Sequence, residues 1–567
     1  MCFLIRQKLI NRVAFMAILI VSISYSVLLE AQEKQTLIPK WSRFQGELIS
    51  LKQYDNPARD LQLKALFNPP VGDPVVVDGF WDGDNDWKIR FMPDMVGKWT
   101  FKITCSDESN LGLHNLEGSF LCTAPDGDTA LSKNGPIRVS RSRTHFMHDN
   151  ENPFFWMADT AWNGALKSNE FDWDNYLVER KRQGFTAIQW VATPWRGAPK
   201  GDVEGQMPFS DKDKTRINPE YFQRLDKRLE AINNAGLISV PVLFWASNEE
   251  ANLINSLSED QAVLLGRYMI ARWGASFGAW ILSADSNYSG QKGERWKKIG
   301  QAIFEDRRRA PVFIHPKAKS WIFESFRDEK WLTAIGYQIG HDINDATNNW
   351  IHNGPPTRDW NKLPRRPIVN LQPPYEWQPS ISKNIPISSN QVRRALYWSL
   401  LNTPTAGVSY GVAGIWGWNN GVDPTIGYPN AGVPPDWRES LNYEGGEQVA
   451  HIASAFNTID FHSLRPDPNV LIDQPGDDSI ASYVASSSSS DGSLVVVYTP
   501  IETRLKINVT KLPSPLIAAW INPRTGERKD VLAVLRGSAL ECPAPGDGDW
   551  LLILRAKQLN TETSLLR

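Results

Sequence analysis

Residues 218–245 read NPEYFQRLDKRLEAINNAGLISVPVLFW, and this stretch predicts one repeating unit of the fold. Asn218-Pro219 begins a helix, because proline is tolerated at the first helical position, where its missing N–H is not needed. Gly236 ends the helix, and the apolar run 239–245 predicts a buried strand. The apolar side chains of the helix recur every three or four positions, as on one buried face: Phe222, Leu225, Leu229 and Ile232. The stretch therefore predicts a helix that leads directly into a strand.

The same alternation of strand and helix extends on both sides of this unit. Further helices begin at Ser258, with acidic residues in the first turn, and at Ser389. Eight strands over roughly 260 residues are typical of a (β/α)8 barrel. An open, doubly wound sheet is the structural alternative, because alternation alone does not distinguish a closed sheet from an open one. The predicted strands are 154–159, 187–192, 239–245, 280–283, 312–315, 332–338, 368–371 and 408–416.

Both flanks of this region carry the short apolar runs and turns of all-β domains. The runs before it are 61–67, 75–77, 87–91, 99–103 and 118–122, and those after it are 493–498, 505–509, 517–520 and 550–554. The sequence thus predicts a multidomain protein. An Ig-like β-sandwich occupies 35–126, a central (β/α)8 TIM barrel 136–463, and a second all-β sandwich 464–557.

The first residues have the pattern of an export signal. Arg6, Lys8 and Arg12 precede an uncharged run over 13–29, and residues 1–32 are therefore predicted to be a signal peptide. The alternative is an uncleaved N-terminal anchor, because the run is long for a signal core and Leu29 is a poor residue before a cleavage site. Both interpretations predict a secreted or periplasmic protein.

Composition narrows the classes of partner. The chain has 61 Lys and Arg against 63 Asp and Glu, a net charge of −2, which argues against nucleic acid or an anionic membrane as the main partner. The 24 tryptophans suit flat ligands with polar edges, such as sugar rings. Cys105 and Cys122 lie in two predicted strands, so a cross-strand disulfide is one option. No cysteine pair has metal-binding spacing, and the sequence predicts neither a metal site nor a cofactor.

Polar and aromatic residues follow most of the predicted barrel strands. In such barrels the reactive groups lie at the carboxyl ends of the strands. Carboxylates beside aromatic rings are what glycoside cleavage requires, because one carboxyl protonates the leaving oxygen while rings stack on the sugar. A single Asp at a strand end, such as Asp159, is also consistent with a helix cap. The strand-end residues are Asp159, Trp162, Gln189, Trp195, Trp245, Asp285, His315, Gln338, His341, Gln372, Tyr375, Glu376, Trp377 and Trp416.

Several stretches of the barrel resemble the apiosidase-like catalytic domain of glycoside hydrolase family 140 and its relatives. They are PFFWMADTAW (153–162), GFTAIQ (184–189), WILSADSN (280–287), HP (315–316), QIGH (338–341) and PPYE (373–376). The N-terminal GFWDG (79–83) and WKIRFMPD (87–94) are similar to the sandwich that often precedes such barrels. The C-terminal VYTP (497–500), WINPRTG (520–526) and DW (549–550) are similar to a collagen-binding-type sandwich. The resemblance implies an exo-acting hydrolase of polysaccharide side chains, with carboxylates after the fourth and seventh strands.

The first of these carboxylates corresponds to Asp285, but the second is replaced. The family pattern after the seventh strand is Gly-Glu-Pro-x-Tyr-Glu, whereas this chain has Leu371-Gln-Pro-Pro-Tyr-Glu376. Gln372 is a neutral amide, so it neither attacks as a carboxylate nor exchanges a proton. Three hypotheses follow: Glu376 supplies the anion, Asp159 supplies it, or the barrel binds sugar without cleaving it.

The sequence therefore predicts a secreted glycoside hydrolase that acts on an oligo- or polysaccharide, with Asp285 as general acid and Glu376 as its anionic partner. The alternative is a catalytically impaired carbohydrate-binding or adhesion protein. Predicted substrate-binding residues are Asp159, Trp162, Gln189, Trp195, Trp245, Asn287, His315, Gln338, His341, Gln372, Tyr375, Trp377 and Trp416.

Overall fold

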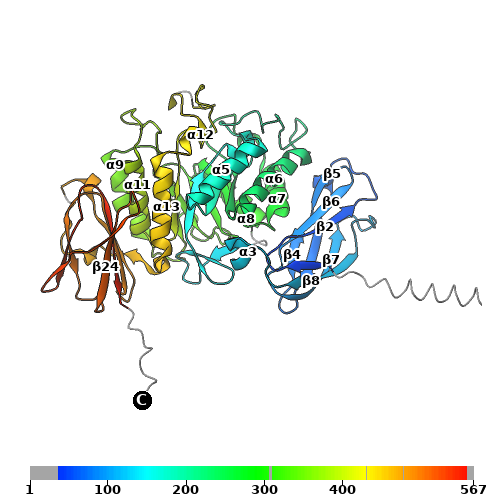
Figure 1. The fold of residues 1–567 in the computed structure, drawn as a ribbon. Helices are drawn as coiled ribbons and strands as arrows, with labels where there is room; N and C mark the ends of the chain where they lie inside the picture. Colours follow the sequence, from blue (N-terminus) through cyan, green and yellow to red (C-terminus); the bar gives the residue numbers. More distant parts are fainter. Residues whose placement is uncertain (1–35, 305–309, 429–430, 477, 558–567) are drawn as a thin grey trace, which may run out of the picture.

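The computed structural model describes residues 36–304, 310–428, 431–476 and 478–557. Three bodies lie side by side, with a helix-covered barrel between two β-sandwiches (Figure 1). The predicted signal peptide and the predicted anchor both lie outside the described residues. Within the described part of the chain, none of the helices has the length and apolarity to cross a membrane.

The central sheet contains eight strands in the order β16-β15-β14-β13-β12-β19-β18-β17, and all its pairs are parallel. The end strands β16 and β17 lie next to each other, where the N–H of Thr333 donates to Val312 O (3.1 Å). The sheet is therefore nearly closed, and the predicted TIM barrel is confirmed. Its strands are β12 (Trp156–Thr160), β13 (Ala187–Val191), β14 (Ile238–Trp245), β15 (Trp280–Ser286), β16 (Val312–Pro316), β17 (Ile335–Gln338), β18 (Ile368–Gln372) and β19 (Gly407–Tyr410).

The last strand is much shorter than the apolar run 408–416 predicts. It ends at Tyr410, and the next residue, Gly411, lies against the ring of Tyr375, where an added Cβ would be 2.2 Å from that ring. The chain then turns into the loop above the barrel, where the backbone N–H of Ala413 donates to Glu376 O (2.8 Å). The apolar character of residues 408–416 therefore gave no indication of this turn.

Helices cover the outside of the barrel. α7 and α11 each begin with a capping box, in which a serine and the glutamine three residues later satisfy each other's backbone N–H. The cap of α11 is Ser388, one residue before the predicted start. The helices are α4 (Gly164–Lys167), α5 (Glu170–Arg182), α6 (Pro219–Asn234), α7 (Glu259–Trp273), α8 (Gly290–Phe304), α9 (Asp345–Asn353), α10 (Pro355–Asp359), α11 (Ser389–Leu401), α12 (Trp437–Ser440) and α13 (Glu444–Asn457).

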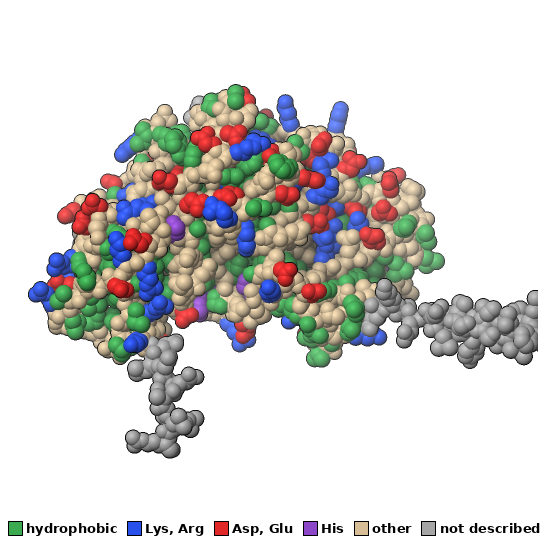
Figure 2. Space-filling view, viewed as in Figure 1, with side chains coloured by type: hydrophobic (Ala, Val, Ile, Leu, Met, Phe, Trp, Pro, Cys, Tyr) green, Lys and Arg blue, Asp and Glu red, His purple; other side chains and the backbone are tan. Residues whose placement is uncertain are grey.

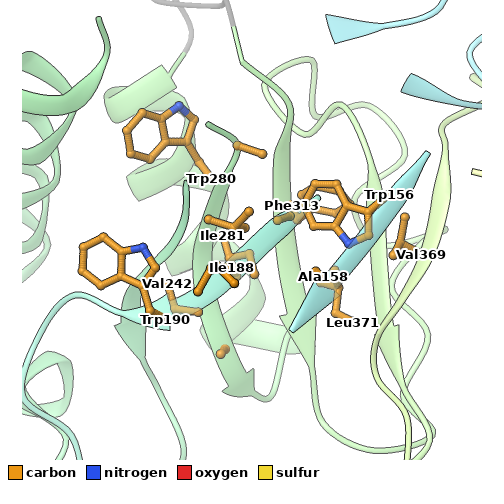
Figure 3. Packing of buried hydrophobic residues seen from close by; sticks show 14 of the residues in the cluster. Trp156, Ala158, Ile188, Trp190, Val242, Trp280, Ile281, Phe313, Val369 and Leu371 are labelled. Atoms are coloured by element: carbon orange, nitrogen blue, oxygen red, sulfur yellow. The ribbon is translucent and has the colours of Figure 1, made fainter. Parts of the chain in front are cut away.

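Apolar side chains fill the interior of the barrel. Figure 3 shows Val242 and Ile281, which pair in register on the neighbouring strands β14 and β15. Trp156 and Phe313 close the interior, with ring centroids 5.2 Å apart, and both are fully buried. The strands are buried on both faces, as expected for a parallel sheet covered by helices.

The N-terminal domain is a sandwich of a five-stranded and a three-stranded sheet, in the orders β1-β8-β7-β3-β4 and β2-β6-β5. Cys122 lies opposite Gly97 at the start of β7, whereas Cys105 ends that strand, so the two thiols are far apart and free. The disulfide considered from the sequence is therefore not formed. The strands are β1 (Leu37–Pro39), β2 (Phe44–Ile49), β3 (Leu63–Asn68), β4 (Val75–Asp78), β5 (Phe80–Gly83), β6 (Asp86–Phe91), β7 (Gly97–Cys105) and β8 (Leu116–Thr123).

Short elements connect this sandwich to the barrel. They are α3 (Ala130–Asn134), β9 (Ile137–Val139), β10 (Phe146–His148) and β11 (Pro153–Phe154), whereas α2 (Pro57–Asp60) lies within the sandwich, between β2 and β3. Buried ion pairs fix the junction: Arg272 on α7 binds Asp82 on β5 (2.6 Å), and Arg90 on β6 binds Asp226 on α6 (2.8 Å). The N-terminal domain is thus held against the side of the barrel.

The C-terminal domain is a second sandwich, with a six-stranded sheet β20-β21-β22-β28-β24-β25 and a three-stranded sheet β23-β27-β26. Buried Arg393 on α11 binds Asp549 through two nitrogens at 2.7 and 2.8 Å, which ties the sandwich to the barrel. Both flanking sandwiches are thereby confirmed. The strands are β20 (Arg465–Pro466), β21 (Ala485–Ser488), β22 (Leu494–Thr499), β23 (Arg504–Asn508), β24 (Leu516–Ile521), β25 (Arg528–Asp530), β26 (Val534–Arg536), β27 (Ala539–Pro543) and β28 (Trp550–Ala556).

The surface in Figure 2 has acidic and basic side chains interspersed over the three domains. This mixture agrees with the near-zero net charge of the whole chain. On the face shown, no single sign of charge dominates.

Candidate active site

Asp285 lies at the carboxyl end of β15, in a local distortion of the strand. Ala284 pairs with His315 and Ser286 with Pro316, so Asp285 is an extra residue on its strand, a β-bulge. Its φ of 58° is in the left-handed region, which non-glycine residues rarely adopt. Bulges and strained backbone often re-aim a side chain at a functional site. The local structure thus makes Asp285 a candidate for chemistry.

The carboxylate of Asp285 is held loosely. Gln338 Nε2 donates to Asp285 Oδ1 at 3.1 Å and also to Pro316 O at 2.9 Å, across the gap between β16 and β17. Arg196 Nη2 is 3.9 Å from Asp285 Oδ2, and the Asp285 side chain remains 23% exposed. Burial raises the pKa of Asp285, although Arg196 and the hydrogen bond from Gln338 oppose this rise. A carboxyl group with a raised pKa and an exposed edge suits a proton donor.

Aromatic and imidazole rings line one side of the opening at the carboxyl ends of the barrel strands, which we call the barrel mouth. The indole N–H of Trp162 donates to the hydroxyl of Tyr375 (2.9 Å), and Trp162 packs against His315 and Trp245 with centroids 5.9 and 5.5 Å apart. Burial lowers the pKa of His315 to about 4, so this ring is neutral at pH 7. Both ring nitrogens of His315 and the indole N–H of Trp245 lack partners among the described residues. These polar atoms are buried and unpaired, so a polar group that entered the opening beside them would satisfy them.

A neutral pair lies after β17 and β18. Gln372 Nε2 is 3.0 Å from His341 Nε2, and the ring of His341 packs on Tyr375 with centroids 4.4 Å apart. Burial lowers the pKa of His341 to about 4, so its Nε2 accepts the amide proton at neutral pH. Gln372 pairs in register with Gln338, the residue that binds Asp285. The side of the mouth formed by β18 therefore presents a neutral amide.

Three further residues complete the rim. Arg196 follows β13 and its guanidinium lies 3.8 Å from the ring centroid of Tyr428, in the loop after β19. Glu249 follows β14 and binds Arg196 Nη1 at 2.5 Å. Sequence reasoning did not single out any of the three, although it included Trp195, which directly precedes Arg196. A search of the whole loops after each strand would have included them.

Glu376 is not part of this mouth, contrary to the prediction that it is the partner of Asp285. Its Oε2 accepts the hydroxyl proton of Tyr410 (2.6 Å) and the backbone N–H of Gly445 (3.1 Å) in the first turn of α13. The side chain of Tyr410 points outward, toward Arg180 on α5. Glu376 therefore lies between the barrel wall and the outer helices, and it shares no contact residue with Asp285.

Asp159 and Gln189 are also bound elsewhere. Asp159 Oδ2 accepts from Tyr176 and Arg180 of α5, both at 2.7 Å, and the carboxylate is fully buried outside the barrel wall. Gln189 lies inside the barrel, where it donates to Leu371 O (2.9 Å) and accepts from Ser409 (2.7 Å). Both side chains therefore bind other parts of the protein and are not placed to contact a ligand.

The remaining predicted residues divide between the mouth and its surroundings. Trp195 packs on Trp245 (4.4 Å), and Trp416 packs on Tyr428 (4.9 Å) and donates to Gln378, so both belong to the mouth. Asn287 is exposed and accepts from the N–H and hydroxyl of Ser289, just before α8. Trp377 is 47% exposed and stacks on Tyr443. Neither Asn287 nor Trp377 contacts the rings of the mouth.

The described residues contain no group of three or more His, Cys, Asp or Glu side chains placed to hold a metal ion. What the mouth offers is one carboxyl with a raised pKa, neutral hydrogen-bonding groups and aromatic rings. This combination is able to bind a sugar and to protonate a glycosidic oxygen.

Three family models together cover most of the chain. Residues 140–463 match the apiosidase-like catalytic domain, and residues 37–106 match a domain of unknown function, DUF5060. Residues 466–555 match a family described as "Putative collagen-binding domain of a collagenase". No functionally curated protein matches the sequence.

Solved structures share the fold at low sequence identity. A glycoside hydrolase is 19% identical, with a TM-score of 0.68 over 77% of this chain and 100% of that one. A family 5 glycoside hydrolase from Bacteroides vulgatus ATCC 8482 is 21% identical, with a TM-score of 0.66 over 76% and 95%. A protein of the same organism described as a "putative glycoside hydrolase" is 16% identical, with a TM-score of 0.70 over 92% and 100%. The catalytic-domain model covers more than half of the sequence, so this chain belongs to the family with the apiosidase-like catalytic domain.

Proposed function

We propose that this protein is a glycoside hydrolase whose barrel mouth binds an oligo- or polysaccharide and whose general acid is Asp285. The observation that carries the proposal is the state of that carboxyl. It is partly exposed, its pKa is raised by burial, and it accepts one hydrogen bond, at 3.1 Å, with the guanidinium of Arg196 3.9 Å away. Membership of the apiosidase-like family supports the same reaction class.

In the proposed reaction the proton of Asp285 passes to the glycosidic oxygen. The bond between that oxygen and the anomeric carbon breaks, and the oxygen of water forms the new bond to that carbon. The water releases a proton as it bonds, and this proton restores the protonated form of Asp285 through solvent. Trp162, Trp245 and Tyr375 border the bound sugar, and His315 and Gln338 bind its hydroxyl groups. Asp285 works in this scheme because loss of its proton is assisted by the nearby charge of Arg196.

The proposal is tested by incubating the purified protein with a panel of plant and microbial polysaccharides and phenyl glycosides. Release of reducing ends or phenol by the wild-type protein, and its loss in Asp285→Asn, is the expected result. Turnover that survives in Asp285→Asn would refute the role of Asp285. An inactive wild-type protein across the panel would count against hydrolysis.

A second candidate function is carbohydrate binding without cleavage. The observation that favours it is the neutral Gln372–His341 pair, together with the engagement of Glu376 by Tyr410 and Gly445. Calorimetric titration of the same oligosaccharides distinguishes the two functions. Saturable binding with no bond cleavage supports the second, and turnover supports the first.

We also propose that the protein acts outside the cytoplasm. The positively charged start and the uncharged run over residues 13–29 carry this proposal. Expression of the full chain followed by N-terminal sequencing of the exported protein tests it. A mature protein that begins near residue 32 supports a cleaved signal peptide, whereas an intact N-terminus in the membrane fraction supports an anchor.

A further inference from the structure

A charged triad lies on the rim of the mouth and includes the proposed acid. The guanidinium of Arg196 lies between two carboxylates, with Nη1 2.5 Å from Glu249 Oε1 and Nη2 3.9 Å from Asp285 Oδ2. The shorter contact is to Glu249, so Arg196 is committed first to that residue. Asp285 is attracted more weakly to the same guanidinium, because it lies farther away.

The loops after β13 and β14 fix this triad in place. The backbone N–H of Arg196 donates to Asn252 Oδ1 (2.8 Å), and Asn252 Nδ2 donates to Ser247 O (2.8 Å) and contacts Glu249 Oε2 (3.3 Å). On its other side, the guanidinium is stacked on Tyr428. Gly427 permits this approach, because a Cβ at that position would be 2.5 Å from Arg196 O. Arg196 is thus held by its backbone, its ring contact and its ion pair.

We propose that Glu249 is a positioning residue that acts through Arg196 to determine how strongly Asp285 holds its proton. This inference rests on the proposed function, in which Asp285 is the general acid. Glu249 does not touch the proposed reacting atoms. It acts by neutralising part of the charge of Arg196, which would otherwise favour the ionised form of Asp285 too strongly for an acid catalyst.

The charges around Asp285 give opposite signs to two substitutions. Arg196 and Lys317 lower its pKa, Glu249 raises it, and Gln338 on β17 contributes a neutral hydrogen bond. The phenol of Tyr428 also faces the group, and burial and Asp285 both contribute to the raised pKa of this phenol, so it is neutral at pH 7. Loss of Glu249 therefore lowers the pKa of Asp285, and loss of Arg196 raises it. A merely structural role would not produce shifts in opposite directions.

The test is the pH profile of kcat/KM on a phenyl glycoside that the wild-type protein hydrolyses. Because activity requires protonated Asp285, it declines as the pH rises through the pKa of that group. Glu249→Gln is expected to move this alkaline limb to lower pH by about one unit, and Arg196→Gln to higher pH by a similar amount. Arg196→Lys, which keeps the charge, should remain close to wild type. Glu250→Gln, an exposed neighbour, is the matched control and should leave the limb unchanged.

Each outcome decides between distinct alternatives. Shifts of both variants in the same direction, or an unmoved limb in folded Glu249→Gln, would overturn the inference while the proposed function stands. A loss of kcat above about 100-fold in Glu249→Gln without a shift would instead make Glu249 a reacting group. A wild-type protein that hydrolyses nothing would refute the proposed function and the inference with it. Circular dichroism of each variant identifies any failure to fold, and the double variant Glu249→Gln/Arg196→Gln, expected near the wild-type limb, gives an independent test.

Discussion

The carboxylate side chain at the mouth of the barrel and those in its outer wall are held by different contacts. At the mouth, Asp285 receives an amide N–H at 3.1 Å and a guanidinium at 3.9 Å. In the wall, Glu376 receives a phenol hydroxyl at 2.6 Å and a helix N-terminal N–H at 3.1 Å. Asp159, also in the wall, receives a phenol and a guanidinium, both at 2.7 Å.

The difference teaches how to separate functional from structural acids in this fold. A wall carboxylate is closed to solvent and accepts at least one hydrogen bond of 2.6 or 2.7 Å, from Tyr410 on β19 or from Tyr176 and Arg180 on α5. The mouth carboxylate has a strained backbone, accepts one hydrogen bond of ordinary length and has a side chain that is 23% exposed, so part of its hydrogen-bonding capacity is available to a ligand. Burial alone does not distinguish the two, because burial raises the pKa of both Asp285 and Glu376.

The largest expected effect falls on the mouth. Asp285→Asn keeps the size of the side chain but removes its proton, so kcat/KM on a phenyl glycoside should fall by about 10²–10⁴-fold. Stability should change little, because the asparagine oxygen still accepts the hydrogen bond from Gln338 and the contact with Arg196 is at 3.9 Å. Steady-state kinetics and thermal unfolding of the same preparations measure both quantities. A strong loss of stability with full activity would reverse the contrast between mouth and wall.

The next effect falls on the wall, and it is one of stability. Asp159→Asn leaves the fully buried Arg180 without its anionic partner, which should cost about 3–5 kcal/mol in the free energy of unfolding. Urea unfolding followed by fluorescence measures this loss. Lys227→Gln is the control, since it removes an exposed ion pair with Glu170 that should contribute less than about 1 kcal/mol. Equal losses in the two variants would contradict the assignment of Asp159 to the wall.

The sequence was sufficient for the architecture but not for this contrast. Helix caps and apolar periodicity located the barrel helices, as Asn218 and Gly236 show for α6. The strands, however, are buried on both faces, so the sequence carries no alternation that tells which side chains point inward. Asp159 was therefore predicted at the mouth although its partners lie on α5, and Glu376, four residues after β18, was predicted there although its partner Gly445 lies at the start of α13.

The residues missed by sequence reasoning have a different cause. Arg196 and Glu249 lie in loops, and their joint contact with Asp285 depends on how the loops after β13 and β14 fold over the mouth. Loop conformation here depends on Asn252, whose side chain bonds backbone groups of both loops. No local periodicity encodes such contacts. By contrast, Asp285, Gln338 and His315 were predictable, since they lie within the last two residues of their strands.

A structurally bound titratable group also lies at the interface between the barrel and the C-terminal sandwich, where His352 is neutral. Its Nε2 contacts Ile480 O (3.2 Å), its Nδ1 contacts Asn402 Nδ2 (3.3 Å), and burial lowers its pKa to about 4. Because the unfolded pKa is near 6.5, the unfolded chain takes up a proton first as the pH falls from 6.5 toward 4.

Stability contributed by neutral His352 is therefore complete above pH 6.5 and is lost on acidification. Between pH 7 and pH 5 this group should account for about 2 kcal/mol of the decrease in unfolding free energy. Urea unfolding of wild type and His352→Gln at both pH values measures this contribution. The free energy of unfolding should decrease less in the variant than in the wild type. The same decrease in both proteins would assign the acid sensitivity to other groups, such as His145, whose pKa is also lowered to about 4.

The smallest expected effect tests the contrast most directly. Glu376→Gln retains an oxygen that accepts from Tyr410 and Gly445, so the wall contact should survive with a loss of about 1 kcal/mol in the free energy of unfolding. Because the side chain lies outside the mouth, kcat on a phenyl glycoside should remain within about twofold of wild type. Steady-state kinetics of Glu376→Gln and Asp285→Asn, assayed in parallel, measure the two changes in kcat. A fall comparable to that of Asp285→Asn, in a protein that unfolds normally, would mean that the wall carboxylate takes part in the reaction after all, and the separation drawn here between bound and available acids would fail for this barrel.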